Sequence, residues 1–382
     1  MKELRVALFT GNYNHIRDGV SLTLNRLVEY LERQNIPVMV FGPSIDEPAI
    51  KHNGELVVTP SIPMLVPGRK EYRIATHFSR AAKKRFVEFN PTLVHIATPD
   101  GLGIGALRYA KKKDLPLVTS YHTHFLSYTK YYSFYLAPVK PFFEWMMLWF
   151  YQQFIHTYVP TPSMIDELKN LGLEANMKIW ARGIDTELFS PEKRDMEWRR
   201  KAGFKDDEIV VTFVSRLVWE KELGTFIESV KRLQAKNPKV RALVVGDGPA
   251  KEEAQKKLPQ GYFTGFCKGE DLARAYASAD VFLFPSHTET FGNVTLEAMA
   301  SGLPCLVADA IGSKSLVDHN VNGCHARPED IDDFTRKLED MISDPVRMKE
   351  MGRRSREMAL DYQWDSINGK LVEYYREALE KH

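Results

Sequence analysis

The chain has 382 residues, of which 44% are hydrophobic and 27% charged, and its formal net charge is +2. A single core rarely extends over so many residues, so the length predicts two domains of a soluble globular protein. The sequence contains no apolar run near the roughly 20 residues that span a bilayer, and no nucleic-acid-binding module.

Charge and cysteine usage indicate where the protein works. Residues 1–186 carry a net charge of +6 and residues 187–382 a net charge of −4, which favours an anionic surface or acceptor near the first half. The N-terminal segment is too short and too strand-like for a signal peptide. Cys267, Cys305 and Cys324 lack CxxC spacing, so we expect free thiols rather than disulfides or a metal site. These features predict a cytoplasmic protein that can associate with the inner face of the membrane.

The first half alternates strands and helices. Strands are predicted near residues 5–10, 38–41, 55–58, 93–96 and 117–120. A glycine-bearing loop follows the first strand and leads into a helix over residues 21–34, whose apolar residues share one face. Gly19 in this loop could let backbone N–H groups approach a phosphate, although a simple helix-initiating turn is the alternative. The loop lacks GxGxxG spacing, so nothing supports a dinucleotide oxidoreductase.

The second half repeats this scheme. Strands are predicted at 209–215, 240–246, near 262 and 281, and at 304–308, with helices at 223–236 and from 293 onward. The join lies near 183–191, and a last helix covers 364–379. We therefore predict an N-terminal domain of residues 1–186 with the helix 363–382 added, and a C-terminal domain of residues 187–362. Such alternation is typical of doubly wound parallel sheets, which bind ligands beyond the carboxyl ends of their strands.

The most informative segment is Glu289-Thr-Phe-Gly-Asn-Val-Thr-Leu-Glu297, in which two carboxylates bracket a Phe-Gly-Asn turn. It follows an apolar strand and runs into a helix. A glycine turn at a helix N-terminus makes an anion site, because backbone N–H groups and the positive end of the helix dipole point to one spot. Carboxylates beside it suit a ligand with a phosphate at one end and hydroxyls at the other, as in a nucleotide sugar.

Two cations follow the first strand of the second half. Arg216 and Lys221 lie where a strand ends, which suits the binding of a diphosphate. The alternative is a solvated loop in which Glu220 or Glu222 pairs with Lys221. Gly246 opens a Gly-Asp-Gly-Pro turn after the next strand and is predicted to line the same site.

Histidine and arginine residues are candidates for contacts with sugar or acceptor. His122 directly follows the strand at 117–120 and can hydrogen-bond a sugar hydroxyl or assist proton movement, with His124 as a competing candidate. Arg182 could contact an acidic group of donor or acceptor, or could pair with Asp185 or Glu187. A zinc site at the two histidines would need further ligands, and none is suitably spaced.

Two other segments permit alternative interpretations. The aromatic stretch 140–154, preceded by Tyr128 to Tyr135, is either buried core or an acceptor or membrane surface. Asp330-Ile-Asp-Asp333 could superficially hold a metal, but acidic residues at the start of a helix are the better explanation.

Together these motifs resemble the family-4 retaining glycosyltransferases of the GT-B fold, and the resemblance covers essentially the whole chain. It rests on Glu289 and Glu297 at E-x7-E spacing, on the Phe-Gly-Asn-Val turn and on the Arg216 and Lys221 pair. The Ser-Tyr-His-Thr segment at 120 and the Trp180–Asp185 segment are similar to bacterial mannosyl-, glucosyl- and sulfoquinovosyl-transferases that glycosylate lipids. Many members have Asn at the position of Arg182 and Asp at that of His124, so the acceptor side differs here.

The resemblance implies a fold, a site and a reaction. It implies two Rossmann-like domains facing across a cleft, with the C-terminal helix crossing back to the first domain. Glu297 would bind ribose, Arg216 and Lys221 would neutralise the diphosphate, and His122 would touch the donor sugar. The other implied donor contacts are Gly19, Gly246, Glu289, Phe291, Gly292, Asn293 and Val294, and the acceptor candidates are Arg182, His124 and Tyr128.

The predicted function is transfer of a sugar from a nucleotide donor, with UDP favoured over GDP, to an acceptor such as a membrane lipid. The resemblance also implies that neither a cofactor nor a metal is needed, because cationic side chains and a helix terminus stabilise the leaving group in members of this fold. No carboxylate is obviously placed as a nucleophile, so front-face attack with retention is preferred. A nucleotide-sugar 2-epimerase of similar fold and a non-catalytic nucleotide-sugar-binding protein are the alternatives.

Overall fold

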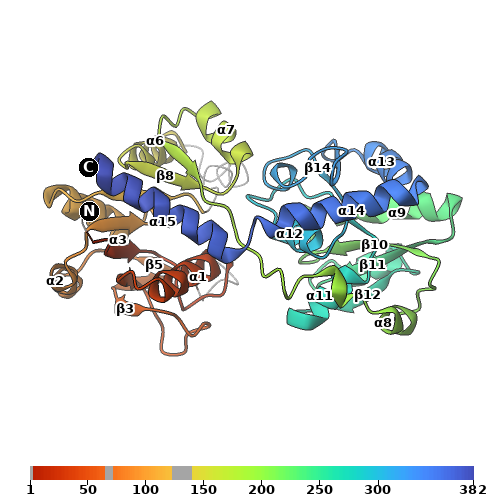
Figure 1. Ribbon diagram of the computed structural model, residues 1–382, viewed down its shortest axis with the longest axis horizontal. Coiled ribbons are helices and arrows are strands. Elements are labelled where there is room, and N and C mark those ends of the chain that lie inside the picture. The colour runs from red at the N-terminus through yellow and green to blue at the C-terminus, as the bar shows by residue number, and fades with distance from the viewer. Residues whose placement is uncertain (1–2, 65–71, 123–139) are drawn as a thin grey trace. The chain divides into compact units, whose positions relative to one another are not determined.

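The chain divides into two compact α/β units (Figure 1). The computed structural model describes residues 3–64, 72–122 and 140–382. Unit 1 comprises Met1–Ala181 and Asp365–His382, and unit 2 comprises Arg182–Trp364. Each unit contains a parallel sheet, so the predicted two-domain α/β architecture is confirmed.

The described residues of unit 1 form a seven-stranded parallel sheet with the strand order β3-β2-β1-β6-β7-β8-β9. Its strands are β1 (Val6–Phe9), β2 (Val38–Gly42), β3 (Glu55–Val58), β6 (Leu93–Ile96), β7 (Leu117–Ser120), β8 (His156–Val159) and β9 (Met177–Ile179). A short antiparallel hairpin, β4 (Ser61–Pro63) with β5 (Arg73–Ala75), stands apart from the sheet. The inner strands are buried along their whole length, as expected where helices cover both faces of a parallel sheet.

The helices of unit 1 include the last helix of the chain. They are α1 (Gly19–Arg33), α2 (Arg80–Phe89), α3 (Gly101–Lys112), α6 (Lys140–Tyr151), α7 (Pro162–Asn170) and α15 (Trp364–Lys381). Leu371, Val372, Tyr375 and Ala378 of α15 are buried in the same core cluster as the residues of β1 and α1. The final helix therefore completes the core of the first domain, and Figure 1 shows it lying along that domain.

Unit 2 repeats the design with a six-stranded parallel sheet in the order β12-β11-β10-β13-β14-β15. Its strands are β10 (Ile209–Val214), β11 (Val240–Val245), β12 (Tyr262–Gly265), β13 (Val281–Phe284), β14 (Cys305–Ala308) and β15 (Gly323–Ala326). Its α-helices are α8 (Met196–Lys201), α9 (Leu223–Lys236), α10 (Lys251–Lys257), α11 (Gly269–Ala277), α12 (Asn293–Ala300), α13 (Ile331–Ser343) and α14 (Pro345–Leu360). Single 3-10 turns occur at η1 (Pro191–Lys193), η2 (Trp219–Lys221) and η3 (Ser313–Ser315).

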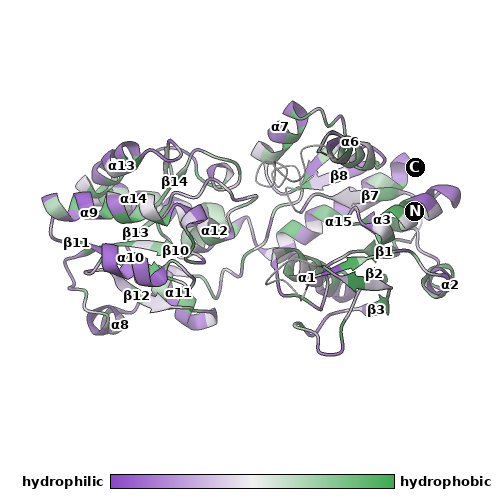
Figure 2. Ribbon diagram, turned by 180° about the vertical axis from the view of Figure 1, so that it is seen from behind, coloured by the Kyte–Doolittle hydropathy of each residue, from purple (hydrophilic) through white to green (hydrophobic). Residues whose placement is uncertain are grey.

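Hydropathy follows this layering. In Figure 2 strand β2 carries the hydrophobic colour, whereas α10, which lies outside, is strongly hydrophilic. β2 is buried throughout, while Ala254 is the buried residue of α10. Because apolar residues gather on the strands and on the inner helix faces, hydrophobic burial fixes which face of each helix turns to the sheet.

Three further predictions can be compared with the structure. The three cysteines are free thiols, as expected. Asp330 caps α13 by accepting a hydrogen bond from the Asp333 N–H (2.9 Å), which confirms the helix-start explanation. The helix expected at residues 21–34 begins two residues earlier, because the Asp18 carboxylate accepts the N–H groups of Val20 and Ser21. Gly19 is thus the first residue of α1, and its placement in the loop before the helix was wrong.

Candidate active site

Three loops of unit 2 meet at the carboxyl edge of its sheet. They follow the adjacent strands β11, β10 and β13 and carry Gly246, Arg216 and Glu289 respectively. Leu217 N–H donates to the Asp247 carbonyl (2.9 Å), so the first two loops are bonded to each other. The order of the strands therefore brings together the predicted motifs of this half.

Gly246 permits the close contact between two of these loops. Its φ is +136°, and a Cβ at this position would lie 1.9 Å from the Ser215 carbonyl oxygen. Such a distance is impossible, so only glycine allows the loop after β11 to pass so close to the loop after β10. The predicted contact of Gly246 with the donor remains a prediction. In the structure, Gly246 allows its own loop to lie against the loop that carries Arg216.

Lys221 and Glu289 form an ion pair between the loops after β10 and β13. The Lys221 Nζ donates to Glu289 Oε1 (2.7 Å) and to Thr288 Oγ1 (3.0 Å), and both charged side chains are about one-fifth exposed (20% and 22%). The alternative in which Glu220 or Glu222 pairs with Lys221 is therefore not what the structure shows. The pair is accessible to a ligand, and it positions an ammonium group at the edge of the site.

Arg216 is a second cation at this edge. Its side chain is exposed, and among the residues that the structure describes no ion-pair partner is found for it. Its planar guanidinium has five N–H donors, which suit the oxygen atoms of a phosphate. Arg216 and Lys221 thus place two cationic groups after β10, of which Lys221 is paired with Glu289.

The helix α12 begins at the same place with a left-handed turn. Gly292 is its N-cap residue with a φ of +98°, and because it has no side chain it cannot cap the first turn. A Cβ on Gly292 would lie 2.7 Å from Ser313 Oγ, so this turn also requires glycine. Within the part of the chain that the structure describes, the backbone N–H groups of Asn293 and Val294 have no side-chain partner, which is the arrangement that favours anion binding.

Glu297 lies one turn further along α12, four residues after Asn293 and hence on the same helix face. Tyr276 of α11 donates its hydroxyl hydrogen toward Glu297 Oε2 (3.0 Å) and the Val294 carbonyl (3.2 Å). Burial raises the pKa of Glu297 to about 7, and the hydrogen bond from Tyr276 opposes this rise. A carboxyl group with such a pKa can both accept and donate hydrogen bonds near neutral pH, which suits a pair of vicinal hydroxyls.

The loop after β14 supports this site and was not selected from the sequence. Gly312 has a φ of +89°, and its Cα approaches so closely that a Cβ would lie 2.5 Å from the Glu289 carbonyl oxygen. Ser313 Oγ lies 3.0 Å from Thr295 Oγ1 of α12. A glycine directly after an apolar strand (residues 305–308) is the signal that could have identified this loop.

The remaining predicted residues lie elsewhere. His122 and Gly19 belong to unit 1, where each follows a strand of the sheet, β7 and β1 respectively. Arg182 is buried in unit 2, and the carboxylate of Asp185 accepts the N–H groups of Glu187 and Leu188. His124 and Tyr128 lie outside the described residues.

Two family models match this chain. "Glycosyltransferase Family 4" covers residues 17–188, and "Glycosyl transferases group 1" covers residues 195–358. A sulfoquinovosyl transferase from Arabidopsis thaliana is 30% identical over 97% of this chain and 73% of its own length. This chain is a group 1, family 4 glycosyltransferase.

Other proteins similar to the glycosyltransferase differ in their named substrates. A GDP-mannose-dependent alpha-mannosyltransferase from Corynebacterium glutamicum is 29% identical over 99% of this chain and 90% of its own. An alpha-monoglucosyldiacylglycerol synthase from Acholeplasma laidlawii is 26% identical over 91% and 88% of the two chains. In the solved structures, the sucrose-phosphate synthase of Thermosynechococcus elongatus superposes with a TM-score of 0.78 at 20% identity, covering 99% of this chain and all of that chain. That likeness identifies the fold as GT-B.

A group of side chains in the described part of the glycosyltransferase could hold a metal ion. Glu222, His287 and Glu329 place one ligand atom each within 4.8 Å of one another. His287 Nε2 lies 3.8 Å from Glu329 Oε1, and Glu222 also accepts a hydrogen bond from Thr225 (3.0 Å). Protein metal sites commonly need four or more ligands, so water would have to complete this one. The group adjoins the donor-site candidates in sequence, which makes a metal test part of any functional assay.

Proposed function

We propose that this glycosyltransferase moves a hexose from a nucleoside diphosphate sugar to a hydroxyl group of a membrane lipid, with retention of anomeric configuration. The observation that carries the proposal is the convergence of Arg216, Lys221 and the uncapped start of α12 at one sheet edge. Glycosyl transfer leaves a diphosphate whose negative charge grows as the bond to the sugar breaks. Two cations and a helix N-terminus at this edge are proposed to stabilise that charge, and Lys221 is held in place by Glu289 and Thr288.

Further residues are proposed to bind the rest of the donor. Glu297, held by Tyr276, is suited to the two ribose hydroxyls. Glu289 and the Phe291–Val294 turn are proposed to contact the transferred sugar and the phosphates, and Gly19 to approach the phosphates from α1. His122 of unit 1 is proposed to hydrogen-bond the transferred sugar.

Retention is supported by the environment of Glu289. Its carboxylate is ion-paired with Lys221 at 2.7 Å, which lowers its availability for attack on an anomeric carbon. We therefore propose that the acceptor hydroxyl attacks from the side the diphosphate leaves, with no covalent glycosyl-enzyme intermediate. NMR analysis of the product tests retention, because an inverted linkage rules out front-face attack.

A panel of donors tests the proposed reaction. We expect one or more of UDP-glucose, UDP-glucuronate, UDP-sulfoquinovose and GDP-mannose to raise the melting temperature, because a ligand at 100 times its Kd stabilises the native state by about 2.7 kcal/mol. A form of the same donor that carries a label on its sugar should transfer that label to a lipid of a lipid extract. Because no metal is expected, dialysis against EDTA should leave the rate of transfer unchanged. Glu329→Gln removes one carboxylate of the group that could hold a metal ion, and it should also leave the rate of transfer unchanged.

The results of the panel separate the alternatives. A donor that is converted without any acceptor indicates an epimerase, and one that binds without conversion indicates a binding protein. If no nucleotide sugar shifts the melting temperature, the proposed function is wrong. UDP donors are favoured by the motifs, while the similarity to a GDP-mannose-dependent relative keeps GDP-mannose in the panel.

A lipid acceptor is supported by the surface of α6. Met147, Phe150 and Tyr151 of this helix are buried, whereas Phe142 and Trp145 are 63% and 59% exposed with their ring centroids 5.8 Å apart. The aromatic stretch is therefore both core and surface. Exposed neighbouring aromatics on a helix in the more basic half suit the interface of an anionic membrane. None of the described helices is both long enough and apolar enough to cross a bilayer.

Replacing both exposed aromatics tests this contact. We expect Phe142→Ser with Trp145→Ser to weaken binding to phosphatidylglycerol vesicles at least tenfold, because burying one such side chain contributes about 1.5–3 kcal/mol. Transfer to lipid should fall in parallel, whereas the donor-induced melting shift should not change. The control is Val87→Ser, on the 56% exposed Val87 of α2. Unchanged sedimentation with vesicles would rule out α6 as the membrane contact.

A further inference from the structure

A chain of hydrogen bonds, called the relay below, runs through unit 1 from the last helix to His122. The Tyr375 hydroxyl lies 2.7 Å from His95 Nδ1, His95 Nε2 lies 3.0 Å from Ser120 Oγ, and Ser120 Oγ lies 2.8 Å from His122 Nε2. Tyr375 belongs to α15, His95 to β6 and Ser120 to β7. The first three side chains are fully or almost fully buried, and His122 is partly exposed.

The number of available protons favours one direction for these bonds. Among the described residues, His95 Nδ1 is the partner of the Tyr375 hydroxyl, so donation to Nδ1 pairs the single phenolic hydrogen, which the reverse direction would leave unpaired in the core. A neutral imidazole that accepts at Nδ1 carries its hydrogen on Nε2 and donates it to Ser120 Oγ. The serine hydroxyl hydrogen is then left to donate to His122 Nε2.

The surroundings of His95 keep its imidazole neutral. Its ring is fully buried, with the ring centroids of Tyr158 and Trp180 each 5.8 Å away, and burial lowers the pKa of His95 to about 3. A doubly protonated His95 would donate at both nitrogens and break the sequence of bonds. Trp180 also packs against His122 at 5.2 Å between ring centroids, so one indole holds both imidazoles in place.

We infer that Tyr375, His95 and Ser120 are positioning residues that hold His122 as the neutral tautomer with its hydrogen on Nδ1 and its Nε2 as acceptor. They do not touch substrate; they act through His122. The inference rests on the proposed contact of His122 with the transferred sugar, since the tautomer decides which ring nitrogen can donate to a sugar hydroxyl. It also assigns a functional task to the C-terminal helix, which supplies the first hydrogen of the relay.

Histidine tautomers can be read directly by NMR of the ¹⁵N-histidine-labelled protein. We expect the wild-type His122 signal, assigned by its loss in His122→Ala, to show the hydrogen on Nδ1. In Tyr375→Phe, His95 Nδ1 has no partner in either direction of the relay, so the preference for one direction is lost and a part of the His122 population should carry its hydrogen on Nε2. Tyr374→Phe removes the same atom from the preceding residue of α15, which stacks on Tyr158 (6.1 Å) and not on His95, and should leave the signal unchanged.

Kinetics supply a second measurement. We expect Tyr375→Phe and Ser120→Ala each to lower kcat about tenfold, with little change in the KM for the donor, because the first removes one hydrogen bond of the relay and the second removes two. The double variant should be no slower than the slower single variant, since both interrupt one path. Tyr374→Phe should keep the wild-type kcat.

The inference is overturned if wild-type His122 carries its hydrogen on Nε2, or if Tyr375→Phe changes neither the tautomer nor kcat. Effects of the two single variants that multiply in the double variant also contradict a shared path. These outcomes differ from failure of the proposed function, in which the wild-type protein transfers no sugar from any donor. The NMR measurement stays informative in that case, because it needs no activity.

Discussion

Replacing Arg216 with alanine is expected to lower kcat by about 10²–10³-fold, which corresponds to a loss of roughly 2.7–4 kcal/mol of transition-state stabilisation. The guanidinium is exposed at the carboxyl end of β10 and has no ion-pair partner among the residues that the structure describes. Its removal therefore leaves no buried charge unpaired, and the melting temperature should stay within about 1 °C of wild type because surface substitutions change stability little. Steady-state rates with the donor identified by the panel provide the measurement.

Two matched variants make this test specific. Arg216→Lys keeps the charge but loses the planar fork, so it should recover only part of the rate. Arg200→Ala removes an exposed arginine of α8 that pairs with Asp206 at 2.7 Å. This control should keep the wild-type rate, because exposed ion pairs contribute little. If Arg216→Ala is also as fast as wild type, this cation does not stabilise the leaving group.

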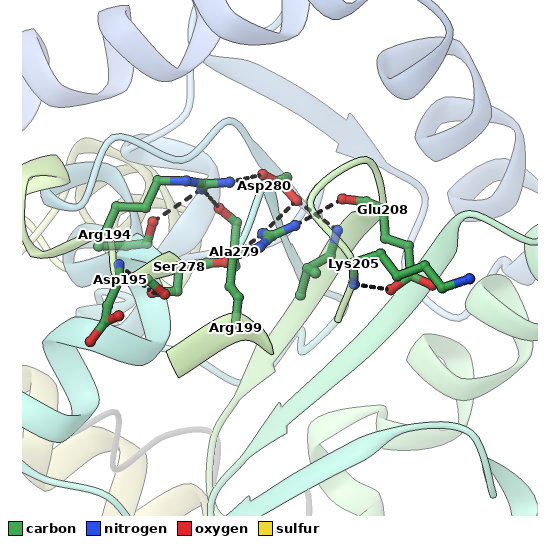
Figure 3. Close-up of polar contacts among 10 residues, drawn as sticks. Arg194, Asp195, Arg199, Lys205, Glu208, Ser278, Ala279 and Asp280 are labelled. Carbon is green, nitrogen blue, oxygen red and sulfur yellow. Dashed lines mark hydrogen bonds and ion pairs between the residues drawn. The ribbon is translucent and has the colours of Figure 1, made fainter. Parts of the chain in front are cut away.

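Replacing Arg199 with alanine is expected to destabilise unit 2 by about 3–5 kcal/mol, without a direct effect on chemistry. Arg199 is fully buried, and its guanidinium donates to the Ser278 carbonyl (2.7 Å), Asp280 Oδ2 (2.9 Å) and the Glu208 carbonyl (2.9 Å), as Figure 3 shows. These bonds join α8 to the segment between α11 and β13 and to the residue before β10. Alanine would leave the Asp280 carboxylate and two carbonyl groups with fewer partners.

Calorimetry measures this loss as a lower melting temperature. A fall of about 6–20 °C is expected, since each kcal/mol shifts a domain of this size by roughly 2–4 °C. The graded control is Arg194→Ala, which also loses a bond to Asp280 (2.8 Å) but from a side chain that is 37% exposed. For Arg194→Ala we expect the free energy of unfolding to fall by about 1–2 kcal/mol. An equal effect of both variants would show that burial does not make the Arg199 interaction special.

Most of the fold could be predicted because apolar runs mark the inner strands. The helix predicted at residues 223–236 coincides with α9, and the strand at 93–96 coincides with β6. Two of the strands that were not predicted, β8 and β15, read His-Thr-Tyr-Val and Gly-Cys-His-Ala. Neither has an apolar run, yet β8 is wholly buried, because distant residues surround its polar side chains. Tertiary packing, which no local pattern records, decides such strands.

The candidate site was predictable to a different degree in each unit. In unit 2 the motifs lie directly after strands, and the strand order brings them together. The partner of Lys221 was not predictable, because Glu220 and Glu222 are its neighbours in sequence while Glu289 is its neighbour in space. In unit 1 the relay could not be predicted at all, since Tyr375 and His95 are 280 residues apart. Gly19 was predicted in the loop and not in the helix, because the prediction did not include Asp18 as the N-cap of α1.

The division of unit 1 into two stretches of sequence has a consequence for synthesis on the ribosome. Residues 365–382 complete its core, so the first domain to emerge must wait for the last helix, while unit 2 (Arg182–Trp364) is one continuous segment. At about 5–20 residues per second, that wait is on the order of 10–40 s. During it, the apolar surface that α15 will cover is exposed to chaperones and to aggregation. The domain translated second can thus be the first to reach its native state.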